Sequence, residues 1–313
     1  MSGDLKEGAE TAVKQCLNVQ SDEEVLIVAD DERMEIAQSI REVSLEEAGE
    51  TMLLNIEKTD QHGAEPPRPV TSAMKDSDVV IAPTTYSLSH TQARIAACNN
   101  GVRMATLPGI TKEIFTTSML ADYEDIKKRS EKIYKLLSGV DEVHVKSPSG
   151  TDISLEIDMD RWDTDTGILH NPGDFGNLPA GETDGSPLNA EGKIVIDSLE
   201  LHGKEIAPPG TEVKIRDTKA VDISEECRLK KVFERVENAR TLAELGIGTN
   251  PKATIIGNIL QDEKVMGTCH FAFGDNTSYG GASKSEIHWD SVIKSPTIKF
   301  DDRKIMERGD FLV

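Results

Sequence analysis

EVLIVADDERMEIAQSIREVSLEEAGETMLLNI, residues 24–56, is the stretch that decides the fold of the N-terminal part of this chain. It begins with a short run of aliphatic residues at 24–29 and ends with a second one at 51–56. Between the two runs, residues 32–48 carry apolar side chains at the three- and four-residue spacing of a helix. Short buried strands joined by a helix build parallel sheets that are covered by helices on both faces. The stretch therefore predicts an α/β domain.

The same alternation of helix and strand continues on either side of this stretch. A helical pattern at 5–18 precedes it, and the run DVVIAP at 78–83, a helical pattern at 90–99 and the run VRMATLP at 102–108 follow. No GxGxxG or GxxxxGK[ST] motif accompanies these strands, so nothing in them supports nucleotide binding. We predict a parallel, Rossmann-like α/β domain over residues 1–121.

The hydrophobic period changes in the second half of the chain. Residues 122–140, which include DYEDIKKRSEKIYKLLSG, have a basic helical pattern and are predicted to form a helical bridge. Beyond them, segments such as EVHVKSP, DISLEIDMD and TEVKIRDTKAVDIS alternate with the period of two that is typical of strands. One helix, at about 223–244, is expected to interrupt the strands. We predict that residues 141–313 form a β-rich α+β domain that binds metal, so the fold class is α/β followed by α+β.

Composition and charge exclude several classes of function. The chain has 313 residues and a formal net charge of −21, and nothing in it would neutralise a run of phosphates, so we expect neither nucleic-acid binding nor adsorption to a membrane. No apolar stretch approaches the roughly 20 residues that span a bilayer. The start, MSGDLKEGAE, lacks the basic and apolar regions of a signal peptide, and the four cysteines include no CxxC pair. We therefore predict a cytoplasmic protein.

One dense block, residues 262–290, carries the sharpest chemical signal of the sequence. It ends on the HxD pair His288 and Asp290, whose side chains point to the same face if the segment is a strand. His270 lies on another predicted strand, which we expect to pair with the first across a glycine-rich loop. Two histidines and one aspartate form a ligand set that suits zinc, manganese, cobalt or ferrous iron.

Two further segments place acidic residues beside glycine-rich turns. GNLPAGETDGSP at 176–187 contains Glu182, and AELGIGTNP at 243–251 contains Glu244, which we expect at the end of the helix before it. Glycine lets the backbone pass close to a bound ion. Together with the histidine block, these segments favour a metal centre in the C-terminal half.

The sequence at these places resembles a known family. GNLPAGE, AELGIGTNP, DEKxxGTxHxAFGDN and SxIHWD are similar, in that order, to motifs of the thermophilic-metalloprotease type of aminopeptidase. The resemblance implies an N-terminal α/β domain, a C-terminal domain that holds two adjacent divalent ions (zinc, cobalt or manganese), and a homodimer. The positions that match the metal ligands of the family are Glu182, Glu244, His270, His288 and Asp290, with Glu244 bridging the ions.

The same resemblance implies two catalytic residues, with an altered spacing. Glu263 corresponds to an acidic residue suited to act as general base, and Tyr279 to a tyrosine that follows the first histidine. Both lie two residues away from the family positions, which Val265 and Thr277 occupy here. The motifs of this sequence resemble more closely those of a divergent branch of the family. That branch includes 2,5-dihydroxypyridine 5,6-dioxygenase, which uses one ferrous iron held by two histidines and an aspartate.

Three functions are compatible with this constellation. We predict a metallo-aminopeptidase that releases N-terminal residues from small peptides with a metal-activated water. The alternative is a mononuclear Fe(II) ring-cleaving dioxygenase, in which His270, His288 and Asp290 hold the iron while Glu182 and Glu244 orient the histidines. A second alternative is a non-catalytic protein that binds a metal or a small molecule.

Overall fold

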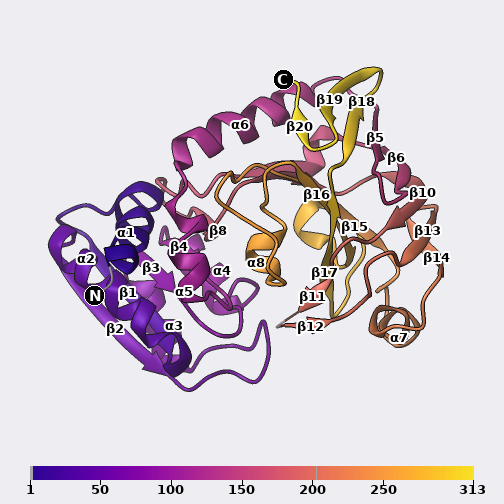
Figure 1. Cartoon of the computed structure of the whole chain (residues 1–313). Helices are drawn as coiled ribbons and strands as arrows, with labels where there is room; N and C mark the ends of the chain where they lie inside the picture. The colour runs from indigo at the N-terminus through magenta and orange to yellow at the C-terminus, as the bar shows by residue number, and fades with distance from the viewer. Residues whose placement is uncertain (1–2, 202) are drawn as a thin grey trace. The chain divides into compact units, whose positions relative to one another are not determined.

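A computed structural model describes residues 3–201 and 203–313 of the chain. The chain divides into two compact units (Figure 1). Unit 1 consists of Met1–Asp125 and Thr166–Ala180, and unit 2 consists of Ile126–Asp165 and Gly181–Val313.

Unit 1 is built on a five-stranded parallel sheet of order β2-β1-β3-β4-β8. Its strands are β1 (Glu24–Asp30), β2 (Glu50–Ile56), β3 (Val79–Ala82), β4 (Arg103–Thr106) and β8 (Phe175–Asn177). Its helices are α1 (Gly3–Glu10), α2 (Met34–Glu47), α3 (Arg68–Asp76), α4 (Gln92–Asn99) and α5 (Lys112–Phe115). The predicted alternation of strands and helices is confirmed.

Both faces of the central strands of unit 1 are buried. Leu26 and Val80 pack in one core with Met74 of α3 and Ala97 of α4, while Ile27, which points the other way, is equally buried. Burial on both faces explains why these strands read as continuous aliphatic runs rather than as alternating ones.

Strand β8 reaches this sheet from a distant part of the sequence. It pairs in parallel with β4, with Met104 opposite Phe175 and Thr106 opposite Asn177. Asn177 accepts hydrogen bonds from the hydroxyls of Thr106 (2.6 Å) and Ser89 (2.9 Å), so polar side chains also join β8 to its neighbours.

Unit 2 contains two larger antiparallel sheets and a short ribbon. The eight-stranded sheet has the order β14 (Lys219–Ile223), β13 (Glu212–Arg216), β10 (Asn189–Val195), β6 (Asp152–Glu156), β5 (Glu142–Lys146), β18 (Thr297–Phe300), β19 (Arg303–Glu307), β20 (Asp310–Phe311). The five-stranded sheet has the order β17 (His288–Lys294), β16 (Thr268–Gly274), β15 (Leu242–Gly248), β9 (Glu182–Gly185), β7 (Trp162–Asp165). The ribbon pairs β11 (Glu200–Leu201) with β12 (Lys204–Glu205).

One hydrophobic core joins the two sheets of unit 2. Phe271 and Phe273 of the five-stranded sheet share it with Val145 and Phe300 of the eight-stranded sheet. Three helices, α6 (Tyr123–Leu136), α7 (Arg228–Arg235) and α8 (Ile259–Asp262), accompany the sheets. The predicted fold class, a parallel α/β part followed by a β-rich α+β part, is confirmed.

The helix expected at about 223–244 is shorter than its pattern indicates. Helix α7 ends at Arg235, and the backbone then becomes extended at Val236 and left-handed at Asn238, with φ of 57°. Glu244 is therefore on strand β15 and not at the end of a helix. The prediction failed because β15 is paired on both edges and buried at every residue, so its apolar run carries no alternation.

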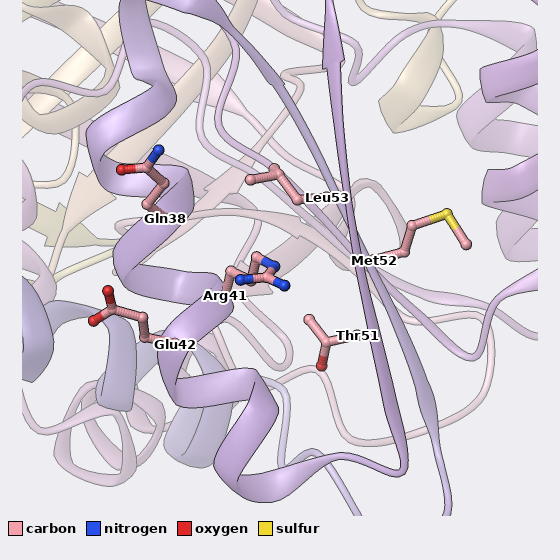
Figure 2. A pocket seen from close by; sticks show the side chains of 6 residues that line it. All are labelled: Gln38, Arg41, Glu42, Thr51, Met52 and Leu53. Atoms are coloured by element: carbon pink, nitrogen blue, oxygen red, sulfur yellow. The ribbon is translucent and has the colours of Figure 1, made fainter.

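A surface hollow of about 500 Å³ lies between α2 and β2 in unit 1 (Figure 2). Its lining residues are Gln38, Arg41, Glu42, Thr51, Met52 and Leu53, and none of the predicted site residues is among them. No helix among the described residues is long and apolar enough to cross a membrane.

Candidate metal centre

The register of the five-stranded sheet brings the acidic and imidazole side chains to one face. Ala272 is paired with Glu244 on one side and with Asp290 on the other. In the next row, Gly246 lies between His270 and Asp184.

Because successive residues of a strand point to opposite faces, the polar residues of these rows share one face of the five-stranded sheet. The other face carries the apolar side chains of the core, such as Phe271 and Phe273.

Small residues on the polar face make room for the large ones. A Cβ atom at Gly246 would lie 2.0 Å from Cε1 and 2.2 Å from Nε2 of His270, so the imidazole occupies the space that a side chain at 246 would need. Gly246 of the AELGIGTNP segment thus makes room for the imidazole of His270, and it does not form a turn.

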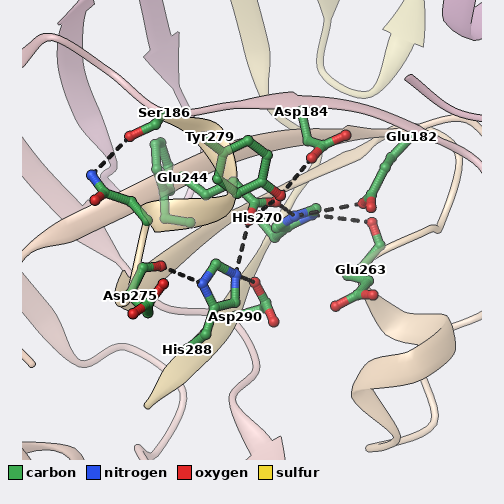
Figure 3. Close-up of polar contacts among 12 residues, drawn as sticks. Glu182, Asp184, Ser186, Glu244, Glu263, His270, Asp275, Tyr279, His288 and Asp290 are labelled. Atoms are coloured by element: carbon green, nitrogen blue, oxygen red, sulfur yellow. Dashed lines mark hydrogen bonds and ion pairs between the residues drawn. The ribbon is translucent and has the colours of Figure 1, made fainter. Parts of the chain in front are cut away.

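Glu244 joins the two imidazoles (Figure 3). Its Oε1 is 2.9 Å from Nε2 of His270, and its Oε2 is 2.9 Å from Nε2 of His288. Asp290 Oδ1 lies 3.5 Å from the same nitrogen of His288. One carboxylate therefore faces the Nε2 atoms of both rings.

Backbone carbonyls fix the orientation of both rings. Nδ1 of His270 donates a hydrogen bond to the carbonyl oxygen of Glu263 (3.1 Å), and Nδ1 of His288 donates one to the carbonyl oxygen of Asp275 (2.7 Å). A carbonyl can only accept, so Nδ1 carries a proton in both rings, and Nε2 is the atom that would bind a metal once its own proton is lost.

A second group of polar side chains adjoins Glu244 and His270. The hydroxyl of Tyr279 is within donating distance of Asp184 Oδ2 (2.6 Å) and Glu244 Oε2 (2.9 Å). Glu182 Oε2 lies 3.6 Å from Nε2 of His270, and this buried oxygen has no hydrogen-bond partner among the described residues.

Lys264 supplies an ammonium group to this second group. Its Nζ pairs with Glu182, with Glu263 at 2.9 Å and with Asp165 at 3.3 Å, and its side chain is 3% exposed. Burial opposes its charge, but the three carboxylates outweigh burial and raise the pKa of Lys264 well above its ordinary value.

The protonation of the cluster reflects its crowded negative charge. Burial raises the pKa of Glu182, Asp184 and Glu263 to about 8. Burial alone would lower the pKa of His270, but the hydrogen bond to Glu244 and the nearby carboxylates hold that pKa at about 10. Without a metal, the centre therefore retains protons that groups exposed to water would have lost at neutral pH.

Among the residues that the structure describes, two sets of donor atoms have the proximity that a metal ion requires. Glu182, Glu244 and His270 form one set, and Glu244, His288 and Asp290 form the other, with the donor atoms of each set within 4.8 Å of one another. The nitrogen and carboxylate donors and the carbonyl-oriented rings fit a bound divalent cation.

All seven residues singled out in the sequence lie in this one cluster. Their elements differ: Glu182 is on β9, Glu244 on β15, His270 on β16, and His288 and Asp290 on β17, while Glu263 follows α8 and Tyr279 ends a short turn at 277–279. Their roles as ligands or catalysts stay predictions. The predicted pairing of the His270 strand with the HxD strand is confirmed, because β16 and β17 are antiparallel neighbours.

Three charged residues of the cluster, namely Asp184, Lys264 and Asp165, were not identified from the sequence. Asp184 stands two residues after Glu182, so the alternation of β9 was a signal for a shared face. Lys264 and Asp165 gave no such signal, since a lysine beside two acids and an aspartate in a polar segment are usually exposed.

Comparisons with known proteins bear on the function. The family model NicX: 2,5-dihydroxypyridine 5,6-dioxygenase matches residues 5–313. The 2,5-dihydroxypyridine 5,6-dioxygenase of Pseudomonas putida KT2440 is 24% identical over 256 residues, which are 76% of this chain and 72% of that protein.

Solved structures show the same fold. The 2,5-dihydroxypyridine dioxygenase of Pseudomonas putida KT2440 has a TM-score of 0.84 at 19% identity and covers 99% of this chain and 97% of its own. Wild-type AmpT from Thermus thermophilus has a TM-score of 0.73 at 17% identity and covers 99% of each chain. The likeness to AmpT supports the predicted relation to the aminopeptidase fold.

The predicted aminopeptidase activity is wrong. The family model that spans the chain is that of a dioxygenase, which overturns the assignments hydrolase, protease and aminopeptidase, and with them the peptide substrate. The motifs misled because carboxylate and imidazole ligands serve both chemistries. The match over residues 5–313 shows that this chain belongs to the NicX family, the family of 2,5-dihydroxypyridine 5,6-dioxygenases.

Proposed function

We propose that this protein is a ferrous-iron-dependent dioxygenase that opens the ring of a small dihydroxylated pyridine. The observation that carries the proposal is the pair of imidazoles, His270 and His288, each fixed at Nδ1 by a carbonyl and facing Glu244 with Nε2. Family membership supports the reaction class, and a dioxygenase of this family implies a metal cofactor.

The ligands of the iron would be His270, His288 and Asp290. Two nitrogens and one carboxylate on one side of the ion suit ferrous iron and leave positions for other molecules. When bound, the iron would bring oxygen and the ring together and pass electrons from the ring, which is oxidised, to the oxygen, which is reduced. The carbonyls at Nδ1 would orient both imidazoles, and Glu244, whose oxygens lie 2.9 Å from each Nε2, would face the same ion.

Glu263 and Tyr279 would handle protons beside the metal. Burial raises the pKa of Glu263 to about 8 in the metal-free centre, and the positive charge of a bound ion would favour its ionised form, which would take a proton from a ring hydroxyl. The hydroxyl of Tyr279 would hold Glu244 and Asp184 in place, since it lies within 2.9 Å of both. Loss of the proton from the ring hydroxyl of the substrate makes that ring richer in electrons and easier to oxidise.

The test is oxygen uptake on a defined substrate. Metal-free protein is loaded with ferrous salt under nitrogen and then mixed with 2,5-dihydroxypyridine in aerated buffer. A dioxygenase places both oxygen atoms in its substrate, so we expect one O₂ consumed for each ring opened and no need for an added reductant. Mass spectrometry with ¹⁸O₂ should find both labelled atoms in the product.

His288→Gln and His144→Gln form a matched pair for this test. His144 also contacts a carboxylate, Asp152 at 2.7 Å, but it lies on β5 outside the cluster. We expect His288→Gln to lose more activity than the roughly 10–100-fold typical of residues that only orient a ligand, and His144→Gln to match the parent. No oxygen uptake by the iron-loaded parent would refute the proposed function, and equal activity in the two variants would refute the assigned site.

A further inference from the structure

Lys264 is a buried cation at the metal centre that the proposed reaction leaves without a role. Its ammonium group lies among the carboxylates of Glu182, Glu263 and Asp165, and the whole residue is 2% exposed. An ammonium group is a donor only, so it balances carboxylate charge but cannot ligate a metal.

The fold holds this lysine in place through its backbone. Lys264 N donates to the carbonyl of Gln261 (3.0 Å), and Lys264 O accepts from the backbone N–H of Asn250 (2.9 Å). The next residue packs against β15 so closely that a Cβ atom at Gly248 would lie 2.2 Å from the carbonyl oxygen of Val265. The side chain therefore starts from a fixed point beside the sheet.

The sheet register supplies two of the acids that receive the ammonium group. Asp165 of β7 and Glu182 of β9 are direct partners in the antiparallel ladder. Side chains directly opposite each other are close enough to share one partner, and two like charges there would repel without a cation between them. Lys264 reaches both, at 3.3 Å for Asp165 and in closer contact for Glu182.

Lys264 affects only one of the two sets of possible metal donors. It binds Glu182 through Oε1, and Glu182 belongs to the set with Glu244 and His270. The ion pairs of Lys264 are with Asp165, Glu182 and Glu263, so the set Glu244, His288 and Asp290 keeps its carboxylates for a metal. A divalent ion at Glu182 would meet the repulsion of the ammonium group at short range in a buried site.

We propose that Lys264 takes the place of a second metal ion and so limits this centre to one ion, bound beside His288 and Asp290 rather than beside Glu182. The inference rests on the proposed function in assuming a metal centre at these residues. It adds the reason why two overlapping sets of donors accept a single ion: the charge that a second ion would bring is already present as an ammonium group.

Mn(II) stoichiometry tests the proposal without any turnover. Metal-free parent, Lys264→Met and Lys264→Gln are dialysed to equilibrium against excess Mn(II), and bound metal per chain is measured by elemental analysis. We expect one ion in the parent and two in each variant. Two Mn(II) ions that share Glu244 should also give an exchange-coupled electron paramagnetic resonance spectrum, which a single ion cannot give.

Lys193→Met is the matched control. Lys193 pairs with Glu212 at 2.9 Å on the other sheet of unit 2, and its side chain is 43% exposed, so its loss should leave the stoichiometry at one. Lys264→Gln keeps a hydrogen-bond donor for Glu182 and guards against misfolding of the methionine variant. Both Lys264 variants should be stabilised by Mn(II) more than the parent, because a metal ion replaces the lost positive charge.

Several results would overturn the inference. They are two ions in the parent, one ion in folded Lys264 variants, and failure of both variants to fold even in excess Mn(II) while the control folds. These outcomes differ from a failure of the proposed function. A parent that binds one Mn(II) but consumes no oxygen refutes the dioxygenase alone, and oxygen uptake by a parent with two ions refutes the role of Lys264 alone.

Discussion

His270 sits in space that exists only because the facing residue of the next strand has no side chain. The ring lies against Gly246, and its two nitrogens contact the Glu263 carbonyl and Glu244. A histidine held at both nitrogens and by packing has one orientation available. At the scale of single residues, the centre therefore depends on a glycine at position 246 as much as on the residues that would bind the metal.

Gly246→Ala should displace the imidazole. The added Cβ atom would lie 2.0 Å from Cε1 of His270, so the ring must shift and Nε2 must leave its place beside Glu244. We expect metal affinity to fall by roughly 10–100-fold, as for the loss of an orienting contact. Overpacking should also lower the free energy of unfolding by about 1–3 kcal/mol.

Isothermal titration with Mn(II) and thermal denaturation measure these two effects. Gly49→Ala is the control, because its added Cβ atom would come no closer than 3.1 Å to another residue, in unit 1. Metal affinity in Gly246→Ala equal to that of the control would show that the ring position does not matter for binding.

The buried acids predict how the stability of the metal-free protein depends on pH. In the folded state the pKa values of Glu182, Asp184 and Glu263 are raised by burial to about 8, and that of His270 is held at about 10. All four lie above their values in the unfolded chain, so the folded state binds more protons between about pH 5 and 10. The free energy of unfolding should therefore fall as pH rises through this window.

Urea denaturation of the metal-free protein at about pH 6 and about pH 9 checks the sign, with a lower free energy of unfolding expected at the higher pH. With metal bound, the ion takes over the role of the protons and the fall should be shallower. Greater stability of the metal-free protein at the higher pH would contradict the protonation described for the cluster.

At the scale of elements, the sequence predicted strands best where they alternate or stand alone between helices. The HxD pair was predicted on a strand beside that of His270, and β16 and β17 have this pairing. The first residues of β15, at 242–244, fall within the predicted helix because burial on both edges and both faces removes the period of the strand. The contact of Lys264 with Asp165 joins residues far apart in the sequence, which no local pattern contains.

Arg103 predicts how the sheet of unit 1 depends on one ion pair. From β4 it donates to both oxygens of Glu23 (2.7 and 2.8 Å) and to the carbonyl of Leu17 (3.0 Å), which ties β4 to the segment before β1. Arg103→Met removes all three of these hydrogen bonds and leaves Glu23 with the backbone N–H of Gln20 (2.8 Å) as a donor. Because Glu23 keeps 16% exposure, we expect a loss of about 2–4 kcal/mol rather than the largest values for buried pairs.

The loss should be visible in urea denaturation, with metal content per chain unchanged, since all the proposed ligands belong to unit 2. Lys58→Met removes the pair with Glu32, in which both side chains are nearly half exposed, and should change stability by less than about 0.5 kcal/mol. Similar effects of the two substitutions would mean that burial does not govern the strength of the Arg103 pair.

At the scale of the whole molecule, the order of the parts could be predicted, whereas the reaction that agrees with the family, that of a dioxygenase, could be predicted only as the alternative to an aminopeptidase. An α/β part and a β-rich part follow from hydrophobic period, which reports burial. The reaction depends on how many ions a shared set of donors accepts, and both candidate chemistries use the same residue types. Homodimerisation and a cytoplasmic location stay predictions, and the mass in solution measured by light scattering would test the first.

The net charge of −21 predicts a response to salt. Acidic residues repel one another more in the compact state than in the expanded chain, and salt screens this repulsion. We expect the melting temperature of the metal-free protein to rise when NaCl is raised from about 0.05 to about 0.5 M. Calorimetry at fixed pH checks this expectation, and a melting temperature that falls with salt would mean that favourable ion pairs outweigh the excess of negative charge.

The position of β8 has a consequence for synthesis on the ribosome. Its partner β4 is complete at Thr106, but β8 at 175–177 is translated only after α6 and β5 to β7 have been made. Until then β4 is an open edge, able to pair with another nascent chain. Chains arrested before residue 175 should be cleaved by protease throughout unit 1, and protection should appear only once Ala180 has left the exit tunnel. Equal protection of shorter chains would show that the first four strands fold alone.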